Sequence, residues 1–483
     1  MLTNLGIQVL MAKYLGAGSE RDALFVAMSV PLFLNTLMVA SFGAVVTPAV
    51  LASGQLMGQR GRANRMLFRL TAAAVVFALA LYLFRGALVQ VLAPGFPEGE
   101  QLRTVGLLEI VLAIVPLQSA SCILGGYWIA RERVLLPSLA LMLGNMVILA
   151  VVAGSGFSLS GTRVAWAFLG GAAITLAVQG VLYSWEGWNT DRAEPEARAP
   201  KTSIYRQSLP LMASSVFGRS APLIERRLAS SMGEGTISCL GYAGYLVSFL
   251  VNATTSPTAT AYYAQMCRHW NEGRQDELTR FLEKGALLVV TCSLALGGAV
   301  ALSAHEFLRV IAPYTRFSAA NVAELADYGV ILMIAYVFLA FSSFIARIFY
   351  AAGRFVQAAL LDCVAVVFYV VTALPLSHWF GGYGLVIAAC LNAAFLSALI
   401  LVTIKRQFAI TLPWRFWAGL LPVLAWWTVV LGLAFLIQSG LALRWAPPAA
   451  TAWSELIYLA GLLVVTARAP QSTGLDWRQL IRR

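Results

Sequence analysis

Apolar runs long enough to cross a lipid bilayer recur from one end of this chain to the other. A membrane-spanning helix needs about 20 apolar residues, and each spanning segment must satisfy its own backbone hydrogen bonds in lipid. The runs do not alternate in polarity as the strands of a membrane barrel do. Only 12% of the residues are charged, against roughly 25% in soluble domains. We therefore expect an all-α polytopic membrane protein with about fourteen transmembrane helices.

The basic residues indicate how these helices are oriented. The expected spans lie near residues 1–16, 23–50, 66–94, 104–130, 134–155, 162–185, 206–231, 236–266, 281–303, 325–350, 355–377, 382–404, 414–438 and 449–467. If the loop 51–65 is cytoplasmic, about 23 of the 34 Lys and Arg residues fall in or beside cytoplasmic loops and about seven on the other side. This asymmetry predicts that both termini are cytoplasmic. It also accounts for the net charge of +12 without nucleic acid as a partner.

A polar stretch near the middle divides the chain into two parts. Residues 186–205 are rich in Pro, Ala and mixed charges, which is typical of a flexible cytoplasmic linker. We expect one six-helix lobe over residues 1–185, a second over 206–406, and two extra helices with a cytoplasmic tail over 407–483. Two halves of this kind are typical of an internally repeated transporter. The sequences LGAG and MGEG, each just before a long predicted helix, are a weak echo of such a repeat.

Residues that could form a catalytic centre are scarce. The three histidines and six cysteines are scattered singly, and no pair has the spacing of metal ligands. The chain contains no glycine-rich phosphate loop with Lys and Ser or Thr. We therefore expect a transporter rather than an enzyme, with no metal or cofactor.

Four basic residues lie within predicted spans: Lys13, Arg219, Arg226 and Arg227. Charge at that depth costs at least about 2.5–3.5 kcal/mol, so it usually faces a cavity or a partner. Arg219 is predicted close to the membrane midplane, on a helix that Pro222 would bend, so that its guanidinium group faces a cavity. Arg226 lies two turns further on the same helix face, where it either lines the cavity or extends to the interface. The same two alternatives hold for Lys13 and Arg227.

Acidic residues also occur within or near the spans. Asp22 heads a helix, where it either caps the N-terminus or takes part in transport. Glu109 and Asp327 are expected near the outer edge, in contact with solvent, and Glu225 lies beside the arginines of the seventh span. Asp362 is deeper, and a buried acid of that kind often binds a proton or a cation. Because guanidinium groups bind phosphate oxygens in pairs, the residues alone predict a transporter whose cargo has an anionic, phosphorylated head.

Several stretches resemble known sequence signatures in the order in which they occur. They are LGAGSERDALFVAMSVPLFL, LAPGFPEGEQL, LASSMGEGTISCLGYAGYL, FYAAGRF and GLVIAACLNA. Together they resemble the MurJ/MviN family of lipid II flippases, which belongs to the superfamily of multidrug, oligosaccharidyl-lipid and polysaccharide exporters. The resemblance implies a V-shaped pair of six-helix lobes with two added helices. It also implies a bacterial inner-membrane protein, active as a monomer, that moves an undecaprenyl-diphosphate-linked sugar between leaflets.

The resemblance also assigns expected roles to particular residues. Lys13 and Asp22 match a basic and an acidic position in the first two helices of the family. With Arg219 and Arg226, they would line a cationic cavity that holds the polar head. Glu225 matches a position that is often acidic or Asn, and some members use such an acid in a sodium site. Asp362 would be its partner in a site for a coupling ion, Na⁺ or H⁺.

The chain departs from the family where arginines are expected to hold the diphosphate. Those places have Ile7 in the first helix, Asn35-Thr36 in the second and Tyr245 in the eighth. Arg219, where the family tends to have Gln, would compensate in part. The substrate is therefore either lipid II or another lipid-linked unit, such as an exopolysaccharide or O-antigen repeat. A drug exporter would require acids to dominate the cavity, and a glycan polymerase would require a large outer loop, which the predicted spans do not leave.

Overall fold

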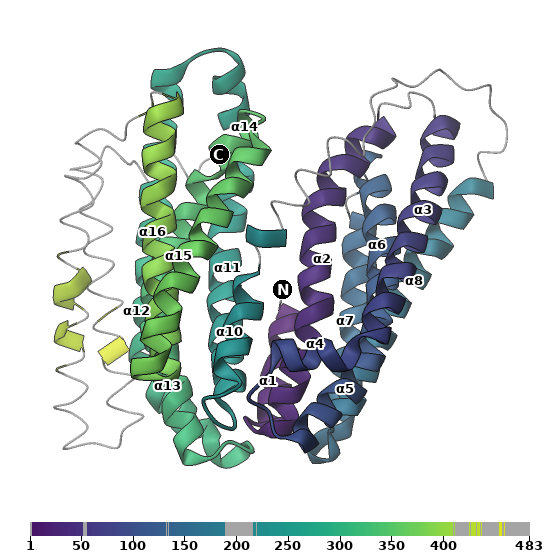
Figure 1. Cartoon of the computed structure of the whole chain (residues 1–483). Helices are drawn as coiled ribbons and strands as arrows, with labels where there is room; N and C mark the ends of the chain where they lie inside the picture. Colours follow the sequence, from purple (N-terminus) through teal and green to yellow (C-terminus); the bar gives the residue numbers. More distant parts are fainter. Residues whose placement is uncertain are drawn as a thin grey trace. The chain divides into compact units, whose positions relative to one another are not determined.

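The computed structural model shows an all-α protein, as the sequence predicts (Figure 1). It describes residues 2–51, 56–131, 133, 135–188, 216–218, 220–408 and 410, with scattered residues between 425 and 458. No strand occurs in these ranges. The chain forms two compact units. We call Met1–Ser238 with Thr315–Phe317 the N-terminal unit, and Cys239–Tyr314 with Ser318–Arg483 the C-terminal unit.

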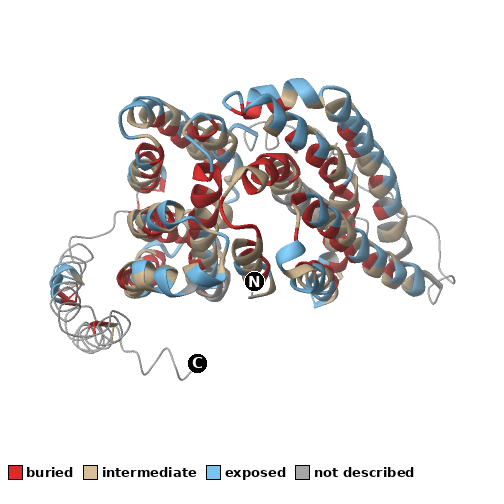
Figure 2. Ribbon diagram, turned by 90° about the horizontal axis from the view of Figure 1, so that it is seen from below, coloured by how far each residue is buried: buried red, intermediate tan, exposed pale blue. Residues whose placement is uncertain are grey.

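The N-terminal unit is built around its second helix. Its helices are α1 (Leu2–Leu15), α2 (Ser19–Leu51), α3 (Leu56–Leu83), α4 (Arg85–Leu92), α5 (Glu98–Leu112), α6 (Ile114–Ala130), α7 (Leu135–Ser155), α8 (Gly161–Trp188) and α10 (Ala221–Ala229). Helix α2 packs against α5 and α6, while α7 packs against α1 and α8. Every residue of α2 from Arg21 to Pro31 is buried. In Figure 2 the buried residues gather where helices of one unit face each other, and exposed residues lie on the outer sides. The first third of α2 is therefore the core of this unit.

Helices α7 and α8 cross at two facing glycines. A Cβ atom on Gly144 would overlap the Thr175 hydroxyl group and lie 2.5 Å from the carbonyl oxygen of Gly171. Small residues at such crossings let two membrane helices approach closely. The side chain is absent here because the neighbouring backbone occupies its place.

Replacing Gly144 by Leu is expected to separate α7 from α8 and destabilise the N-terminal unit. Overpacking of this kind typically costs about 1–3 kcal/mol or more, because the blocking atoms include backbone that cannot rotate away. Thermal unfolding of the purified protein measures the change. Gly154→Leu is the matched control on the same helix, because a Cβ atom there meets no other atom within 4 Å. Equal melting temperatures for the two variants would contradict this account of the crossing.

The C-terminal unit is built around α13. Its helices are α11 (Thr236–Asn271), α12 (Gln275–Ile311), α13 (Ala319–Ile345), α14 (Arg347–Ala351), α15 (Phe355–Phe380) and α16 (Gly382–Phe408), and the first three residues of α11 belong to the N-terminal unit. Helix α13 packs against α12 and α16, and α15 packs against α16. The side chains of Tyr328, Tyr336 and Phe344 on α13 are fully buried. Described residues near the C-terminus also contact α12, since the Trp427 indole N–H donates to the Leu294 carbonyl at 2.9 Å.

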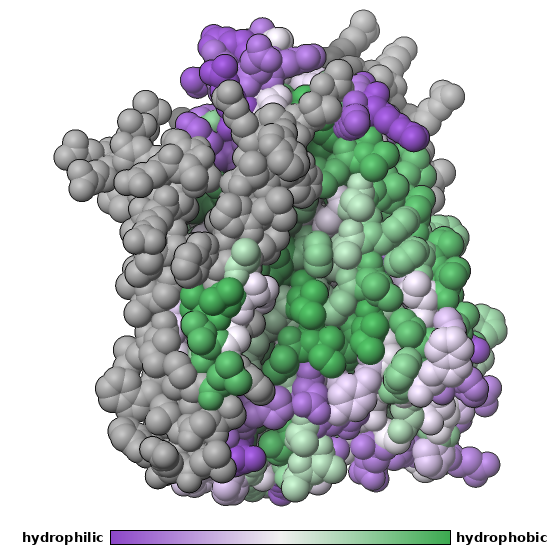
Figure 3. Space-filling model, turned by 90° about the vertical axis from the view of Figure 1, so that its left-hand side faces the viewer, coloured by the Kyte–Doolittle hydropathy of each residue, from purple (hydrophilic) through white to green (hydrophobic). Residues whose placement is uncertain are grey.

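The outer surface of the C-terminal unit is apolar over the length of its helices. Helix α15 exposes one row of side chains three or four residues apart: Leu360, Val364, Val367, Val371 and Leu374. This spacing places them on one face of the helix. In Figure 3 hydrophobic side chains form a band on this side of the molecule, with hydrophilic side chains above and below it. The band is the surface expected of a protein that contacts lipid.

The structure supports the membrane assignment and refines the expected spans. Ten helices in the described ranges are long and apolar enough to cross a membrane. Of the four other expected spans, the first is α1, which has 14 residues, and the last two fall mostly outside the described residues. The expected span 66–94 is divided into α3 and α4 at Phe84. The span 104–130 begins earlier, in α5, and is interrupted at Ala113, since Pro116 has no N–H to bond the carbonyl of Leu112.

The seventh expected span, 206–231, is interrupted where a bend was predicted. Residues 216–218 are helical, Ser220 is not, and α10 begins at Ala221 with Pro222 in its first turn. Proline is favoured in the first turn of a helix because its missing N–H has no partner there. Arg219 lies outside the described residues.

Candidate functional site

The start of α2 carries a buried carboxylate that caps a second helix. Asp22 is only 2% exposed. Its carboxylate accepts hydrogen bonds from the backbone N–H of Gly235 at 2.6 Å and of Ser238 at 2.8 Å, and from the Ser238 hydroxyl group. Gly235 precedes α11 and Ser238 lies in its first turn, so the carboxylate occupies the positive end of that helix. The sequence predicted that Asp22 either caps its own helix or takes part in transport; in the structure Asp22, on α2, caps the other helix, α11.

Two glutamates make matching contacts with other helix ends. The Glu234 carboxylate accepts from the backbone N–H of Ser19, the first residue of α2, at 2.9 Å. The Glu20 carboxylate accepts from the backbone N–H of Gly161, the first residue of α8, at 2.7 Å. An acid at a helix N-terminus contributes about 0.3–1 kcal/mol when exposed and up to about 2 kcal/mol when partly buried. Asp22, Glu20 and Glu234, with the N–H groups that they accept from, are called the acid-cap network below.

The two similar sequences LGAG and MGEG both lie next to the acid-cap network. LGAG (15–18) precedes α2, and MGEG (232–235) precedes α11. The MGEG segment therefore supplies an acid, Glu234, to the start of α2, and α2 supplies an acid, Asp22, to the start of α11.

Next to Asp22, Arg21 is a buried cation that the sequence analysis did not single out. It is 4% exposed. Its guanidinium group donates to the Gln8 side-chain oxygen at 3.0 Å and to the Met11 sulfur at 3.4 Å, both on α1. Its central carbon lies 4.0 Å from the centre of the Phe25 ring. A cation is disfavoured in the first turn of a helix, so this unusual position was the signal that the sequence offered.

Arg226 approaches the same phenylalanine from α10. Its guanidinium group donates to the Phe25 carbonyl oxygen, and its central carbon lies 5.4 Å from the centre of the Phe25 ring. The neighbouring Arg227 donates to the Val91 carbonyl of α4 at 2.7 Å. Both arginines therefore bind backbone carbonyls and hold α10 against α2 and α4.

The predicted site residues are distributed over both units of the structure. Asp22 and Arg226 lie within the first two turns of α2 or against them. Lys13 is in the last turn of α1, half-buried, with its amino group 5.4 Å from the centre of the Tyr14 ring. Glu225 is half-buried on α10 of the N-terminal unit, whereas Asp362 is half-buried on α15 of the C-terminal unit. Among the described residues, no group of three His, Cys, Asp or Glu side chains could hold a metal ion. The coupling-ion site stays a prediction.

The residues at the positions where the resemblance led us to expect arginines make contacts that suit neutral side chains. Ile7 is completely buried in α1. The Asn35 side-chain oxygen accepts from the Cys122 thiol at 3.9 Å, and the Thr36 hydroxyl group donates to the carbonyl of Leu32 at 2.7 Å. Tyr245 is half-buried on α11.

Comparison with known proteins agrees with this arrangement of helices. The family described as "Lipid II flippase MurJ" matches residues 11–452. A solved structure of the lipid II flippase MurJ in an inward closed conformation superimposes with a TM-score of 0.79 at 13% identity, and the match covers 97% of each chain. An inward-facing multidrug transporter of the MATE family matches with a TM-score of 0.69 at 16% identity, over 85% of this chain and 94% of the other.

A third similar structure is a transporter of the same superfamily from Pyrococcus furiosus. It is described as a transporter whose binding pocket has reversed polarity, which suggests a different function for that protein. It matches with a TM-score of 0.61 at 15% identity, over 84% of this chain and 92% of the other. At these identities the three structures establish the fold alone. The assignment to a family depends on the match over residues 11–452.

Proposed function

This chain belongs to the MurJ lipid II flippase family, and from that premise we propose that it moves a polyprenyl-diphosphate-linked sugar across the bacterial inner membrane by alternating access. The observation that carries the proposal is the family match over nearly the whole chain. Related transporters of the MATE family have been solved facing inward and facing outward, and both forms share this fold. We place both termini in the cytoplasm because of the distribution of Lys and Arg.

The contacts suggest which candidate residues have a structural role and which bind the substrate or the coupling ion. Asp22 and Arg226 are bonded to backbone groups, so we assign them to the architecture of the N-terminal unit. Lys13 and Arg219 are assigned to the phosphates of the substrate, because a diphosphate requires cations to balance its charge at membrane depth. We also propose Na⁺ or H⁺ as the coupling ion, with Glu225 and Asp362 as the acids to test.

There are two candidates for the lipid-linked sugar that the protein transports. Lipid II is the substrate that the family name gives. A different lipid-linked unit, such as an exopolysaccharide or O-antigen repeat, is favoured by the neutral side chains at Ile7, Asn35, Thr36 and Tyr245. With these residues, the proposed cavity would hold fewer cations than the family pattern implies.

Complementation distinguishes the two candidates. The chain is expressed in a bacterium whose own lipid II flippase can be shut off, and membrane blotting confirms that it accumulates. Growth identifies lipid II as a substrate. Failure to grow with the protein present assigns another lipid-linked glycan, which is then tested in a strain that lacks its exopolysaccharide flippase. Failure in both strains contradicts the proposed function.

Arg219→Ala is expected to lower the rate of flipping by about tenfold or more, whereas Arg219→Lys keeps a large part of it. The reason is that a cation at membrane depth is needed for the diphosphate, and lysine retains the charge without the bidentate geometry. Transport of a labelled lipid-linked sugar in proteoliposomes measures the rate. Arg280→Ala is the control, because it removes the same charge from an exposed position on the first turns of α12. Unchanged transport by both Arg219 variants would rule out a cavity centred on this residue.

A further inference from the structure

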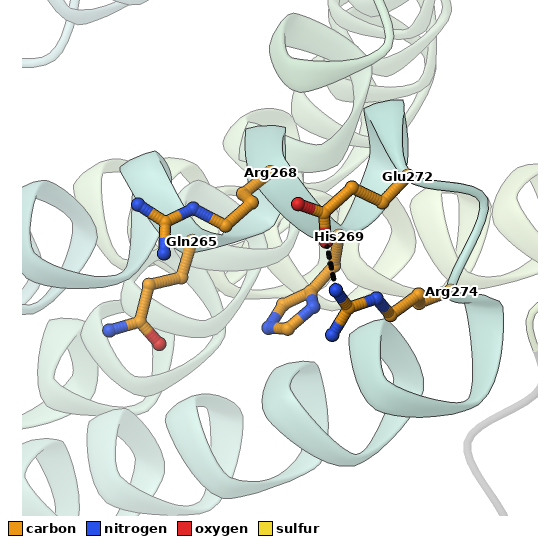
Figure 4. Close-up of a pocket in the computed structure, with 5 residues that line it drawn as sticks. All are labelled: Gln265, Arg268, His269, Glu272 and Arg274. Atoms are coloured by element: carbon orange, nitrogen blue, oxygen red, sulfur yellow. Dashed lines mark ion pairs between the residues drawn. The ribbon is translucent and has the colours of Figure 1, made fainter.

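A polar pocket lies where α11 ends and α12 begins, at the opposite end of α11 from the acid-cap network. It has a volume of about 460 Å³ and is lined by Gln265, Arg268, His269, Glu272 and Arg274 (Figure 4). Ligand pockets usually measure roughly 300–1,000 Å³. All five lining residues can form hydrogen bonds, and two of them are arginines. Such a lining suits a small, strongly hydrated anion.

The backbone of the hairpin fixes the shape of the pocket. The N–H of Arg274 donates to the His269 carbonyl at 3.0 Å, and the N–H of Gly273 donates to the Trp270 carbonyl at 3.1 Å. Gly273 has a φ of +70°, which only glycine adopts readily. These two bonds form a Schellman motif, which closes α11 and turns the chain directly into α12. His269 and Arg274 are therefore held beside each other by the turn itself.

The two acids at this turn, Glu272 and Glu277, already have partners within ion-pair distance. Arg274 lies 2.8 Å from the Glu272 carboxylate and 3.2 Å from the Glu277 carboxylate. His269 Nδ1 lies 3.1 Å from the same Glu277 carboxylate, which leaves Nε2 for another partner. The ion pair between Glu272 and Arg274 is drawn in Figure 4.

The second arginine that lines the pocket is Arg268. It is exposed, and the part of the chain that the structure describes places no carboxylate within ion-pair distance of it. Gln265 is one turn earlier on α11, and its side chain extends alongside Arg268 in Figure 4. Arg268 and Gln265 thus provide hydrogen-bond donors on one side of the pocket, next to His269. Guanidinium groups bind phosphate in bidentate fashion.

The surroundings of the pocket add to its positive charge. The rings of Trp270 on α11 and Phe408 at the end of α16 are 5.1 Å apart, and Arg354 lies 4.7 Å from the centre of the Phe408 ring. Lys405 and Arg406 are in the last turn of the same α16. This end of the C-terminal unit therefore carries basic side chains from several helices, which raises the local concentration of anions.

We propose that the pocket of Gln265, Arg268 and His269 binds a phosphate group, with Arg268 as its principal ligand and Arg274 as a positioning residue. The phosphate could belong to a small soluble ester or to the head group of an acidic lipid. The distance of the pocket from the hydrocarbon core favours the soluble ester as the source of the phosphate. The uncharged run 285–304 of α12 matches the hydrocarbon core, and Arg274 precedes it by about 16 Å of helix. The head-group layer is only about 5–8 Å thick on each side.

The test uses the full chain in phosphatidylcholine nanodiscs with ¹⁵N-labelled histidine. The chain has three histidines, His269, His305 and His378, so the imidazole signals can be assigned with single variants. Added inorganic phosphate is expected to shift the His269 signals saturably and leave those of His305 and His378 unchanged. A second sample contains phosphatidic acid in the nanodisc and no free phosphate. A shift of the His269 signals in this sample alone supports the site and identifies a lipid source.

Two matched variants decide whether the pocket itself is responsible. Arg268→Gln is expected to weaken phosphate binding by about tenfold or more, as the loss of a charge-assisted hydrogen bond predicts. Arg280→Gln removes the same charge from α12 without touching the pocket, and should have little effect. Thermal unfolding shows that both variants remain folded. The proposal is overturned if neither form of phosphate shifts His269 saturably, or if Arg280→Gln weakens binding as much as Arg268→Gln does.

Discussion

Asp22→Asn is expected to abolish complementation and to lower the stability of the N-terminal unit by about 3 kcal/mol, the order expected when buried donors lose a charged acceptor. The carboxylate accepts three hydrogen bonds from Gly235 and Ser238. An amide has only one oxygen, so its NH₂ group must face an N–H donor on one side. The variant therefore loses at least one of these bonds and the negative charge at the start of α11.

Thermal unfolding and amide hydrogen exchange at residues 235–238 measure this effect. Glu20→Gln is the matched control, because Glu20 is only half-buried and accepts a single bond, from Gly161. Its loss is expected to be well under half of that for Asp22→Asn. An Asp22→Asn protein that unfolds at the wild-type temperature would contradict the capping role. If that protein also failed to transport, Asp22 would be assigned to substrate or ion movement instead.

Arg21→Ala is expected to destabilise the N-terminal unit by about 2–5 kcal/mol, the range for removing a long buried side chain. The change leaves a cavity between α1 and α2, and it leaves the Gln8 side-chain oxygen without the donor it has at 3.0 Å. Arg21→Lys is expected to fall between Ala and wild type, because lysine keeps the charge but lacks the planar group that lies over Phe25.

The melting temperatures of the purified variants test this order. Arg227→Ala is the control, since Arg227 is exposed and makes one hydrogen bond, to the carbonyl of Val91. It should melt close to wild type. If Arg21→Ala and Arg227→Ala lowered the melting temperature equally, the buried contacts of Arg21 would not be important for stability.

The helices were predictable because their apolar runs carry a strong local signal. Most of the expected spans coincide with helices, and Pro222 indicated the interruption near Ser220. Interruptions without such a residue were not foreseen: Phe84, between α3 and α4, has no proline near it. Local sequence predicts where a helix exists better than where packing divides it.

The contacts of the site were less predictable, because they join residues far apart in the chain. The sequence indicated that Asp22 suits a helix N-terminus, but the helix that it caps begins more than two hundred residues later. Arg21 was overlooked because an arginine beside an acid at a helix start looks like a solvated residue. Its burial depends on contacts with Gln8 and Met11 of α1, which no local pattern records.

The acid-cap network also determines where this protein can tolerate genetic change. Nearly all of its donors are backbone N–H groups, which every amino acid except proline provides. A substitution at Ser19 therefore keeps the backbone bond to Glu234, whereas Gly161 is more restricted, because a Cβ atom there would lie 3.3 Å from the Glu20 side chain. The acceptors are side chains, so the whole arrangement depends on the codons for Asp22, Glu20 and Glu234.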